Sequence, residues 1–190
     1  MCSVPPHPAG PRRFLIAILA AAAAAACSAP STVPAPFVSP LAAASAPVSC
    51  HARGTEGYVL PDPACTPGAT NSEVTPATVA TTVCHAGWTA TVRPPESYTQ
   101  RIKREQMQAY GWTGPLSDYE EDHLIPLELG GAPSDPRNLW PEPGERNNPK
   151  DKMENAANRA VCQGRMQLAD AQRAIAGDWI TFGRQLGAIT

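Results

Sequence analysis

Apolar and polar positions divide the chain into stretches of different character. Residues 14–26 form an unbroken apolar run, and residues 28–49 form a tract of Pro, Ala, Ser and Val with neither charge nor periodicity. Such a tract is typical of an extended linker and cannot build a core. We therefore expect a linker over residues 28–50 and one domain over residues 51–190, because compact domains usually have about 100–200 residues.

Short strands are expected in the first part of that domain. Between residues 51 and 95, short apolar stretches are separated by Pro and Gly. The β-branched segment 79–83 and the alternating apolar positions of segment 88–92 predict two short strands bounded by turns. Cys84 lies between them, and a disulfide from this residue would hold strands that are too short to be stable alone.

Three helices are expected in the rest of the domain. The first covers residues 95–110, with proline near its first turn and Gly111 as its stop signal. The second has Asn148 as a good N-cap, Pro149 at the first helical position and Asp151 three residues after the cap, as in a capping box. It ends near Gly164, and the third helix runs from about residue 168 to residue 186.

Each expected helix has one buried face. In the first helix the apolar stripe is modest and consists of Tyr98, Ile102, Gln106 and Tyr110. The second has Met153, Ala156, Ala157, Ala160 and Val161, and the third has Ala171, Ile175, Trp179, Ile180 and Phe182. Trp88, Trp140 and Trp179 are expected in the core, whereas Glu120 and Glu121 are expected on a solvated edge.

The N-terminal end predicts export. Arg12 and Arg13 precede the apolar run, which is shorter than the about 20 residues of a membrane-spanning helix, so residues 1–27 are interpreted as a secretory signal. Cys27 follows three alanines, as in a bacterial lipobox, although the favoured leucine three positions earlier is absent. Two interpretations stay open: membrane attachment through a lipidated Cys27, or ordinary cleavage that removes it. Both predict an extracellular or periplasmic protein.

Four cysteines follow the signal, and their pattern favours disulfides. Cys50, Cys65, Cys84 and Cys162 form an even set, which in an exported small domain indicates two bridges with three alternative pairings. A four-cysteine zinc site is the alternative, but structural zinc normally uses closely spaced pairs of cysteines. The chain has no such C-x-x-C pair.

The charge limits how the protein could contact nucleic acid. Without the two signal arginines, 15 − 2 = 13 basic residues stand against 17 acidic ones, a net charge of −4. A protein that binds nucleic acid over a wide surface is normally basic. Any such contact must therefore be local.

The stretch with candidate chemistry lies between residues 119 and 151. An Asp122-His123 pair enters a short apolar segment, a Gly-Gly turn follows, Asn138 precedes a second short apolar segment, and an Asn-rich stretch opens a helix. This layout resembles the HNH endonuclease family, whose core is the ββα-metal or His-Me finger. The intervals 138 − 123 = 15 and 147 − 138 = 9 suit such a finger. The resemblance implies an α+β fold with a motif core at residues 119–162.

The resemblance also implies roles for single residues. His123 would be the general base, since phosphodiester hydrolysis needs a group that deprotonates water. Asp122 and Asn147 would bind a divalent metal, Mg²⁺ or alternatively Mn²⁺, with Asp151 as a rival to Asn147. Asn138 would support the geometry of the site. The sequence departs from the family where Asn147 replaces a frequent histidine, and where the paired zinc-binding cysteines of many members are absent.

Arg137 and Lys150 are the candidate contacts to the phosphate backbone, with Arg146 as an alternative. The function that follows is an exported endonuclease, with DNA favoured over RNA as its substrate. One alternative is a cell-envelope module that keeps the fold for binding without catalysis, and the acidic charge favours it. Another is a metal hydrolase that acts on a different phosphoester.

Overall fold

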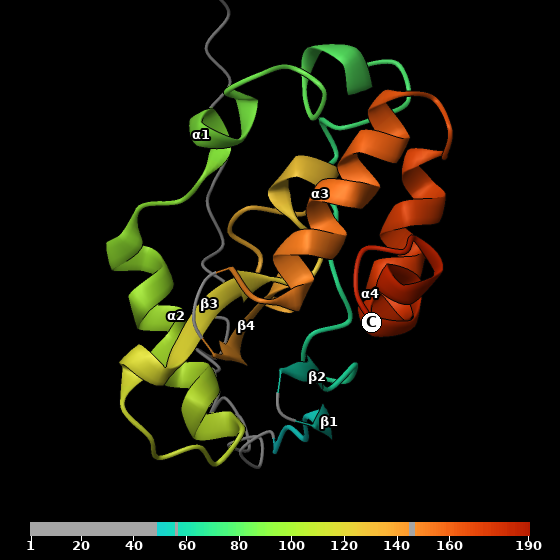
Figure 1. Ribbon diagram of the computed structural model, residues 1–190. Coiled ribbons are helices and arrows are strands. Elements are labelled where there is room, and N and C mark those ends of the chain that lie inside the picture. The colour runs from blue at the N-terminus through green and yellow to red at the C-terminus, as the bar shows by residue number, and fades with distance from the viewer. Residues whose placement is uncertain (1–48, 56, 145–146) are drawn as a thin grey trace, which may run out of the picture. The chain divides into compact units, whose positions relative to one another are not determined.

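The computed structural model describes residues 49–190, except residue 56 and residues 145–146 (Figure 1). The expected signal, Cys27 and nearly all of the expected linker lie outside these residues. The described part contains helices and two antiparallel sheets of two strands each, so the expected α+β class is confirmed. None of the helices in the described part is long and apolar enough to cross a membrane.

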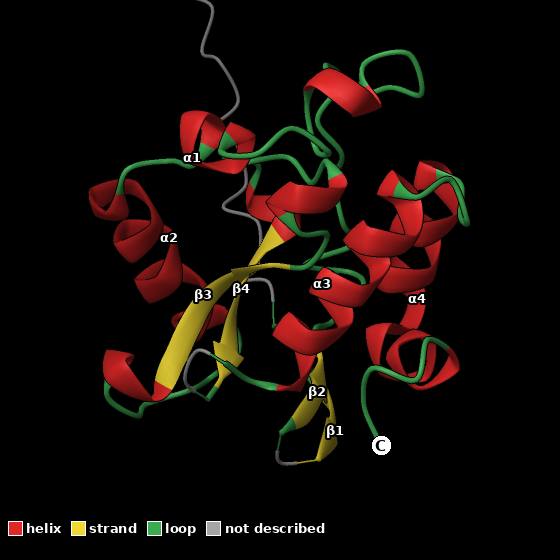
Figure 2. Ribbon diagram, turned by 45° about the horizontal axis from the view of Figure 1, so that its top comes forward, coloured by secondary structure: helices red, strands yellow, loops and turns green. Residues whose placement is uncertain are grey.

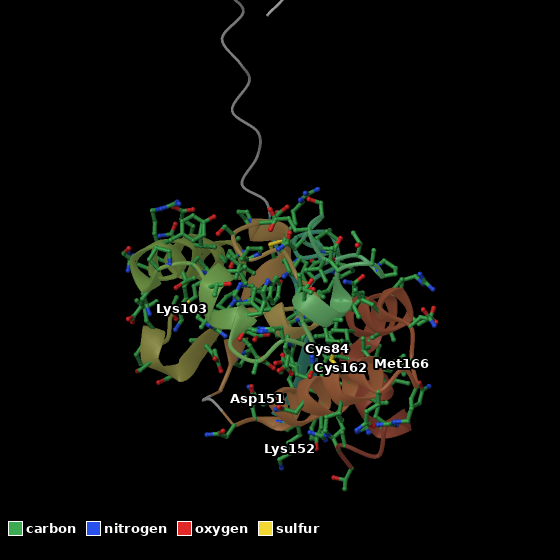
Figure 3. The ribbon with its side chains drawn as sticks, turned by 90° about the horizontal axis from the view of Figure 1, so that it is seen from above. Cys84, Lys103, Asp151, Lys152, Cys162 and Met166 are labelled. Carbon is green, nitrogen blue, oxygen red and sulfur yellow. A yellow bond between two sulfur atoms is a disulfide. The ribbon has the colours of Figure 1, made fainter. Side chains whose placement is uncertain are left out.

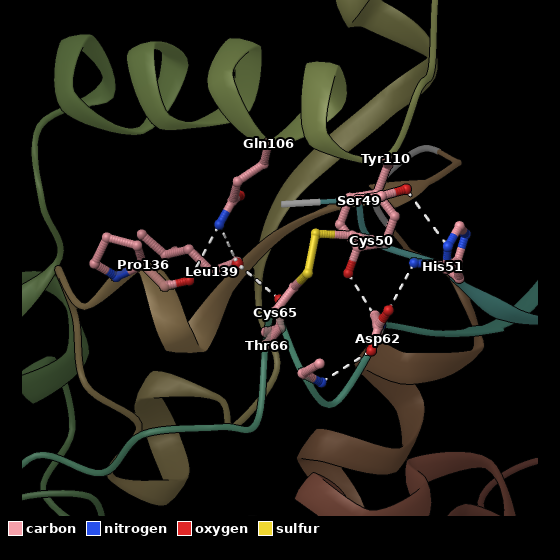
Figure 4. The surroundings of a disulfide bond; sticks show 11 residues. Ser49, Cys50, His51, Asp62, Cys65, Thr66, Gln106, Tyr110, Pro136 and Leu139 are labelled. Carbon is pink, nitrogen blue, oxygen red and sulfur yellow. Dashed lines mark hydrogen bonds between the residues drawn. A yellow bond between two sulfur atoms is a disulfide. The ribbon is translucent and has the colours of Figure 1, made fainter. Parts of the chain in front are cut away.

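The folded part includes the end of the expected linker. Cys50 is buried, its backbone N–H donates to the carbonyl of Ala109 at 2.9 Å, and its sulfur is bonded to Cys65 (Figure 4). Cys50, the last residue of the expected linker, is therefore packed and bonded as part of the fold. The small sheet that follows pairs β1 (Arg53–Thr55) with β2 (Tyr58–Leu60).

The two strands expected around Cys84 are wrong. Val79–Thr81 is a 3₁₀ helix, and Trp88–Val92 is the α-helix α1. Threonine side chains bond the local backbone here: Thr82 Oγ1 donates to the carbonyl of Thr78 at 2.7 Å. Such local bonds favour turns over strand pairing. The second disulfide joins Cys84 to Cys162, which resolves the pairing that the sequence left open.

The larger sheet lies between two helices. β3 (Tyr119–His123) pairs antiparallel with β4 (Leu139–Pro143), and Figure 2 shows this pair between α2 (Glu96–Ala109) and α3 (Pro149–Cys162). Side chains alternate between the faces of a strand. By this alternation Glu121 and His123 share one face of β3 and Asp122 has the other, yet Asp122 and His123 both line one cavity at the end of the strand.

The predicted helices agree closely with the structure. α2 begins after Pro95, and Gly111 follows it with a φ of 66°. The full capping box at the start of α3 is present: the Asn148 side chain accepts backbone N–H bonds, and the Asp151 side chain accepts the backbone N–H of Asn148. α4 (Leu168–Gln185) contains a kink at Asp178.

The core lies between α3, α4 and the chain that precedes α1. Trp140 and Trp179 are fully buried as expected, whereas Trp88 is half-buried against the core. Trp179 Nε1 donates to the carbonyl of Val59 at 3.0 Å, which attaches the small sheet to α4. Short 3₁₀ turns complete the loops: Leu116–Asp118, Leu127–Leu129 and Pro136–Asn138.

Candidate functional site

Asn138 holds the loop between β3 and β4. Its side chain is fully buried, and its amide donates to the carbonyls of Ile125 at 3.0 Å and Ala132 at 3.1 Å. Its Oδ1 accepts the backbone N–H of Ile125 at 2.9 Å. Gly131 lies so close that a Cβ there would be 1.7 Å from the Ile125 carbonyl oxygen, so only glycine fits. The Gly-Gly turn and Asn138 thus fix the chain that follows His123.

The imidazole of His123 is oriented by a backbone carbonyl. Its Nε2 lies 2.9 Å from the carbonyl oxygen of Pro133. A carbonyl can only accept, so Nε2 has the proton and Nδ1 has the lone pair of the neutral ring. Burial lowers the pKa of His123 below its usual range, which keeps the ring neutral near pH 7. Nδ1 is therefore the nitrogen that can take a proton.

A cavity of about 120 Å³ adjoins this ring, and we call it the His123 cavity. α1 supplies Thr89, and Arg93 follows at the end of the same helix. The carboxylate residues that line it are Glu120, Glu121, Asp122, Glu128, Asp151 and Glu154. It shares His123 with a larger cavity of about 370 Å³ beside α2. His123 as a residue is 6% exposed, and it lines both cavities.

Lys150 is enclosed behind Asp122. Its side chain is 1% exposed, and its Nζ lies 2.7 Å from Asp122 Oδ2. It also donates to the carbonyl of His123 at 2.9 Å and pairs with Glu154. Burial alone would lower the pKa of Lys150, but the carboxylates of Asp122 and Glu154 raise it overall. The three N–H groups of the ammonium each have a partner: Asp122, the His123 carbonyl and Glu154. In this geometry Lys150 has no N–H group left to bind a substrate phosphate.

The expected solvated edge at Glu120 and Glu121 is wrong, because both side chains are half-buried. Both carboxylate oxygens of Glu121 are buried without a hydrogen-bond partner, and so is Oε1 of Glu128. Burial raises the pKa of Glu121 to about 8 and that of Glu154 to about 8. Among the described residues, six carboxylate residues line the cavity, whereas the nearby cationic side chains are Lys150, Lys103 beside Glu121, and Arg93.

The donor chemistry of the His123 cavity fits the divalent metal that the resemblance implies. Within the described residues, no three His, Cys, Asp or Glu side chains form a ready metal-binding group. Mg²⁺, however, commonly uses one or two carboxylates together with waters and substrate phosphates. Asp122 and Asp151 line the cavity, whereas Asn147 is exposed, has a φ of 66° and does not line it. The structure thus brings Asp151, and not Asn147, to the same cavity as Asp122.

Arg137 lies elsewhere. Its guanidinium is exposed, pairs with Asp135 at 2.6 Å and lines a separate cavity beside Cys65 and Gln106. Arg146 is outside the described residues. The sequence analysis missed Arg93, which enters the site through the packing of α1 and has no local signal. It also missed Glu154, although its spacing from Lys150 and Asp151 places all three on neighbouring positions of one helix.

Comparison with known proteins gives no relative from which a role could be transferred. No protein-family model matches the chain, and neither a curated protein nor a solved structure does. The functional argument therefore depends on the residues and their geometry alone.

Proposed function

We propose that this protein is an exported, metal-dependent endonuclease of the HNH type, with β3, β4 and α3 as its ββα-metal core. The observation that carries the proposal is the environment of His123. Its Nε2 is held by the Pro133 carbonyl, and its ring lines a carboxylate-rich cavity together with Asp122 and Asp151. A neutral imidazole in a fixed orientation can act as a general base. Carboxylate oxygens next to it can bind a divalent cation, and phosphodiester hydrolysis uses both groups.

In this proposal the chain has three tasks. His123 Nδ1 accepts the proton of the attacking water, and Pro133 and Asn138 keep the ring and its loop in place. Arg93, which lines the cavity, contacts the phosphate that is cut. Asp122 and Asp151 would hold the cation, and Lys150 fixes Oδ2 of Asp122 at 2.7 Å. When bound, the cation would neutralise negative charge on the phosphate and on the leaving oxygen.

Export is supported by the covalent structure. Two disulfides, Cys50–Cys65 and Cys84–Cys162, are typical of proteins that fold in an oxidising compartment. The secretory signal belongs to the proposal, with attachment through Cys27 or its removal by ordinary cleavage as the two alternatives, and DNA is the favoured substrate. The same cavity could serve another phosphoester, so RNA and small phosphodiesters are compared with DNA in the assay.

The deciding experiment is cleavage of plasmid DNA by the purified protein with Mg²⁺ or Mn²⁺. The His123→Ala variant is expected to lose about 10²- to 10⁴-fold in rate, the usual contribution of a general base. Arg173→Ala is the matched control, because Arg173 is exposed on α4 and pairs with Asp170 away from the cavity. EDTA is expected to abolish cleavage. Equal rates for the wild type and His123→Ala would refute the proposal.

A second candidate is a binding module of the cell envelope without catalytic activity. The net charge of −4 after removal of the signal arginines favours it, since a polyanion is repelled by an acidic protein. A binding module predicts that the wild type does not cleave DNA with any metal ion. The same assay therefore separates the two candidates.

A further inference from the structure

The His123 cavity is the middle of a longer groove. It shares Arg93 and His123 with the cavity beside α2. On its other side it shares Thr89 and Glu128 with a third cavity of about 390 Å³, which lies beside the Cys84–Cys162 disulfide. We call this third space the disulfide cavity. Three cavities that share lining residues in this way adjoin one another, and we treat them together as one groove.

Two helices supply the walls of the groove. On α1, Thr89 and Arg93 are four residues apart and therefore lie on one side of the helix. On α3, the lining residues Glu154, Asn158 and Cys162 recur every four residues. Figure 3 shows Cys162 joined to Cys84, and Asp151 farther along α3. The path thus follows one face of α3 from its start to its end.

The disulfide cavity differs in charge from the His123 cavity. It is lined by the exposed side chains of Arg159 and His85, with Glu128 as its one acidic residue among the described lining side chains. The middle of the groove has six acidic residues against one arginine. A phosphate chain passing along this path would therefore meet a cationic contact at the disulfide cavity.

The wall of the disulfide cavity is also fixed in place. The amide of Asn158 donates to the carbonyl of Val83 at 3.1 Å and to that of Glu128 at 2.7 Å. The Cys84–Cys162 bond ties the loop before α1 to the end of α3 at the same point. A cavity whose wall is held by covalent and hydrogen bonds loses little entropy when a ligand binds.

We propose that the disulfide cavity is a subsite for a backbone phosphate next to the one that is cut, so that the substrate is a polynucleotide strand lying along the groove. The proposal rests on the proposed function. Arg159 is its main contact, because a guanidinium can bind a phosphate through two parallel hydrogen bonds. A local contact of this kind also agrees with the acidic net charge of the chain.

The test compares a single-stranded oligonucleotide with bis(p-nitrophenyl) phosphate, a diester that has no neighbouring phosphate. Arg159→Ala is expected to raise the KM for the oligonucleotide about five- to tenfold, with a smaller effect on the small diester. The slope of binding against salt concentration is expected to fall by about 1. Arg173→Ala is the control that removes one exposed arginine outside the groove.

Binding of a fluorescent oligonucleotide in EDTA gives a second measurement without turnover. Weaker binding by Arg159→Ala than by Arg173→Ala supports the subsite. Equal binding by the two variants overturns it, and so does an equal loss of activity on both substrates. Full activity of His123→Ala would instead overturn the proposed function while leaving the binding comparison intact. A wild type that does not bind the oligonucleotide overturns both.

Discussion

Under the proposed function, His123 and Asn138 divide two tasks between them. The imidazole supplies a proton acceptor, and the amide supplies order in the loop that follows it. Asn138 satisfies two carbonyls and one N–H that have no access to water, so its contribution is larger than that of an exposed asparagine. Both residues were named from the sequence through the resemblance to the HNH family, and their roles in catalysis stay predictions.

Replacing Asn138 tests this division. Asn138→Ala is expected to lower the free energy of unfolding by about 3 kcal/mol or more, because the buried groups of Ile125 and Ala132 would lose their partner. Urea denaturation measures the loss. Asn155→Ala is the control, since Asn155 is exposed and its amide bonds only the preceding turn of α3. A loss no greater than that of the control would contradict the role assigned to Asn138.

The burial of Lys150 could not be predicted from the sequence around it. From the sequence, Lys150 was a candidate contact to the phosphate backbone because it is a basic residue beside the candidate site. In the structure it is enclosed by Asp122 and Glu154. Its burial depends on the packing of α3 against β3, which is a long-range contact. The same holds for Lys103, which is buried in α2 and donates to the backbone of Leu116 and Tyr119.

At the level of elements, local signals decided which predictions succeeded. α2, α3 and α4 were predicted nearly to their ends, because caps, proline positions and apolar spacing are all encoded within each helix. The strands expected at 79–83 and 88–92 failed, since a strand needs a partner that its own sequence does not specify. The break in α4 at Asp178 was also missed.

The kink in α4 gives a prediction for pH dependence. Asp178 accepts the backbone N–H groups of Ile180 and Thr181 at 3.0 Å and 2.9 Å, and so caps the second half of the helix. Burial alone would raise the pKa of Asp178, but these hydrogen bonds lower it overall. Because the folded-state pKa is below the unfolded one, the stabilisation is present above the unfolded pKa and is lost as pH falls through the folded value.

Asp178→Ala is therefore expected to cost about 1 kcal/mol of unfolding free energy at pH 7, and less in acid. Asp178→Asn is the control, because its side chain can still cap but does not titrate. Thermal unfolding from pH 7 down to about 3 follows the difference through the usual range of an aspartate pKa. A difference between wild type and Asp178→Ala that grows in acid would refute this interpretation.

At the scale of the whole molecule, two disulfides close loops of very different length. Cys50 and Cys65 are 15 residues apart, whereas Cys84 and Cys162 are 78 apart and enclose α1, α2, β3, β4 and most of α3. The sequence indicated that four cysteines pair but could not choose the partners, because pairing depends on how distant elements pack. The groove was likewise invisible in the sequence, since its walls come from helices separated by more than fifty residues.

The difference in loop length predicts a difference in stability. Replacing Cys84 and Cys162 by serine is expected to lower the unfolding free energy by about 4 kcal/mol, against about 3 kcal/mol for the Cys50 and Cys65 pair, because the longer loop restricts the unfolded chain more. Guanidinium denaturation of the two double variants measures both values. The reverse order would show that strain or native contacts outweigh loop entropy.

If the proposed function holds, the bond between Cys84 and Cys162 also affects when the protein could act on the DNA of the cell that produces it. In a reducing cytoplasm the two thiols stay separate, and the loop ahead of α1 is no longer tied to the end of α3. Under the proposed function, the strand-binding path is then incomplete until the polypeptide has crossed the membrane. If the proposed function holds, forming this bond after export would delay completion of the path until the protein is away from the chromosome of the cell that makes it.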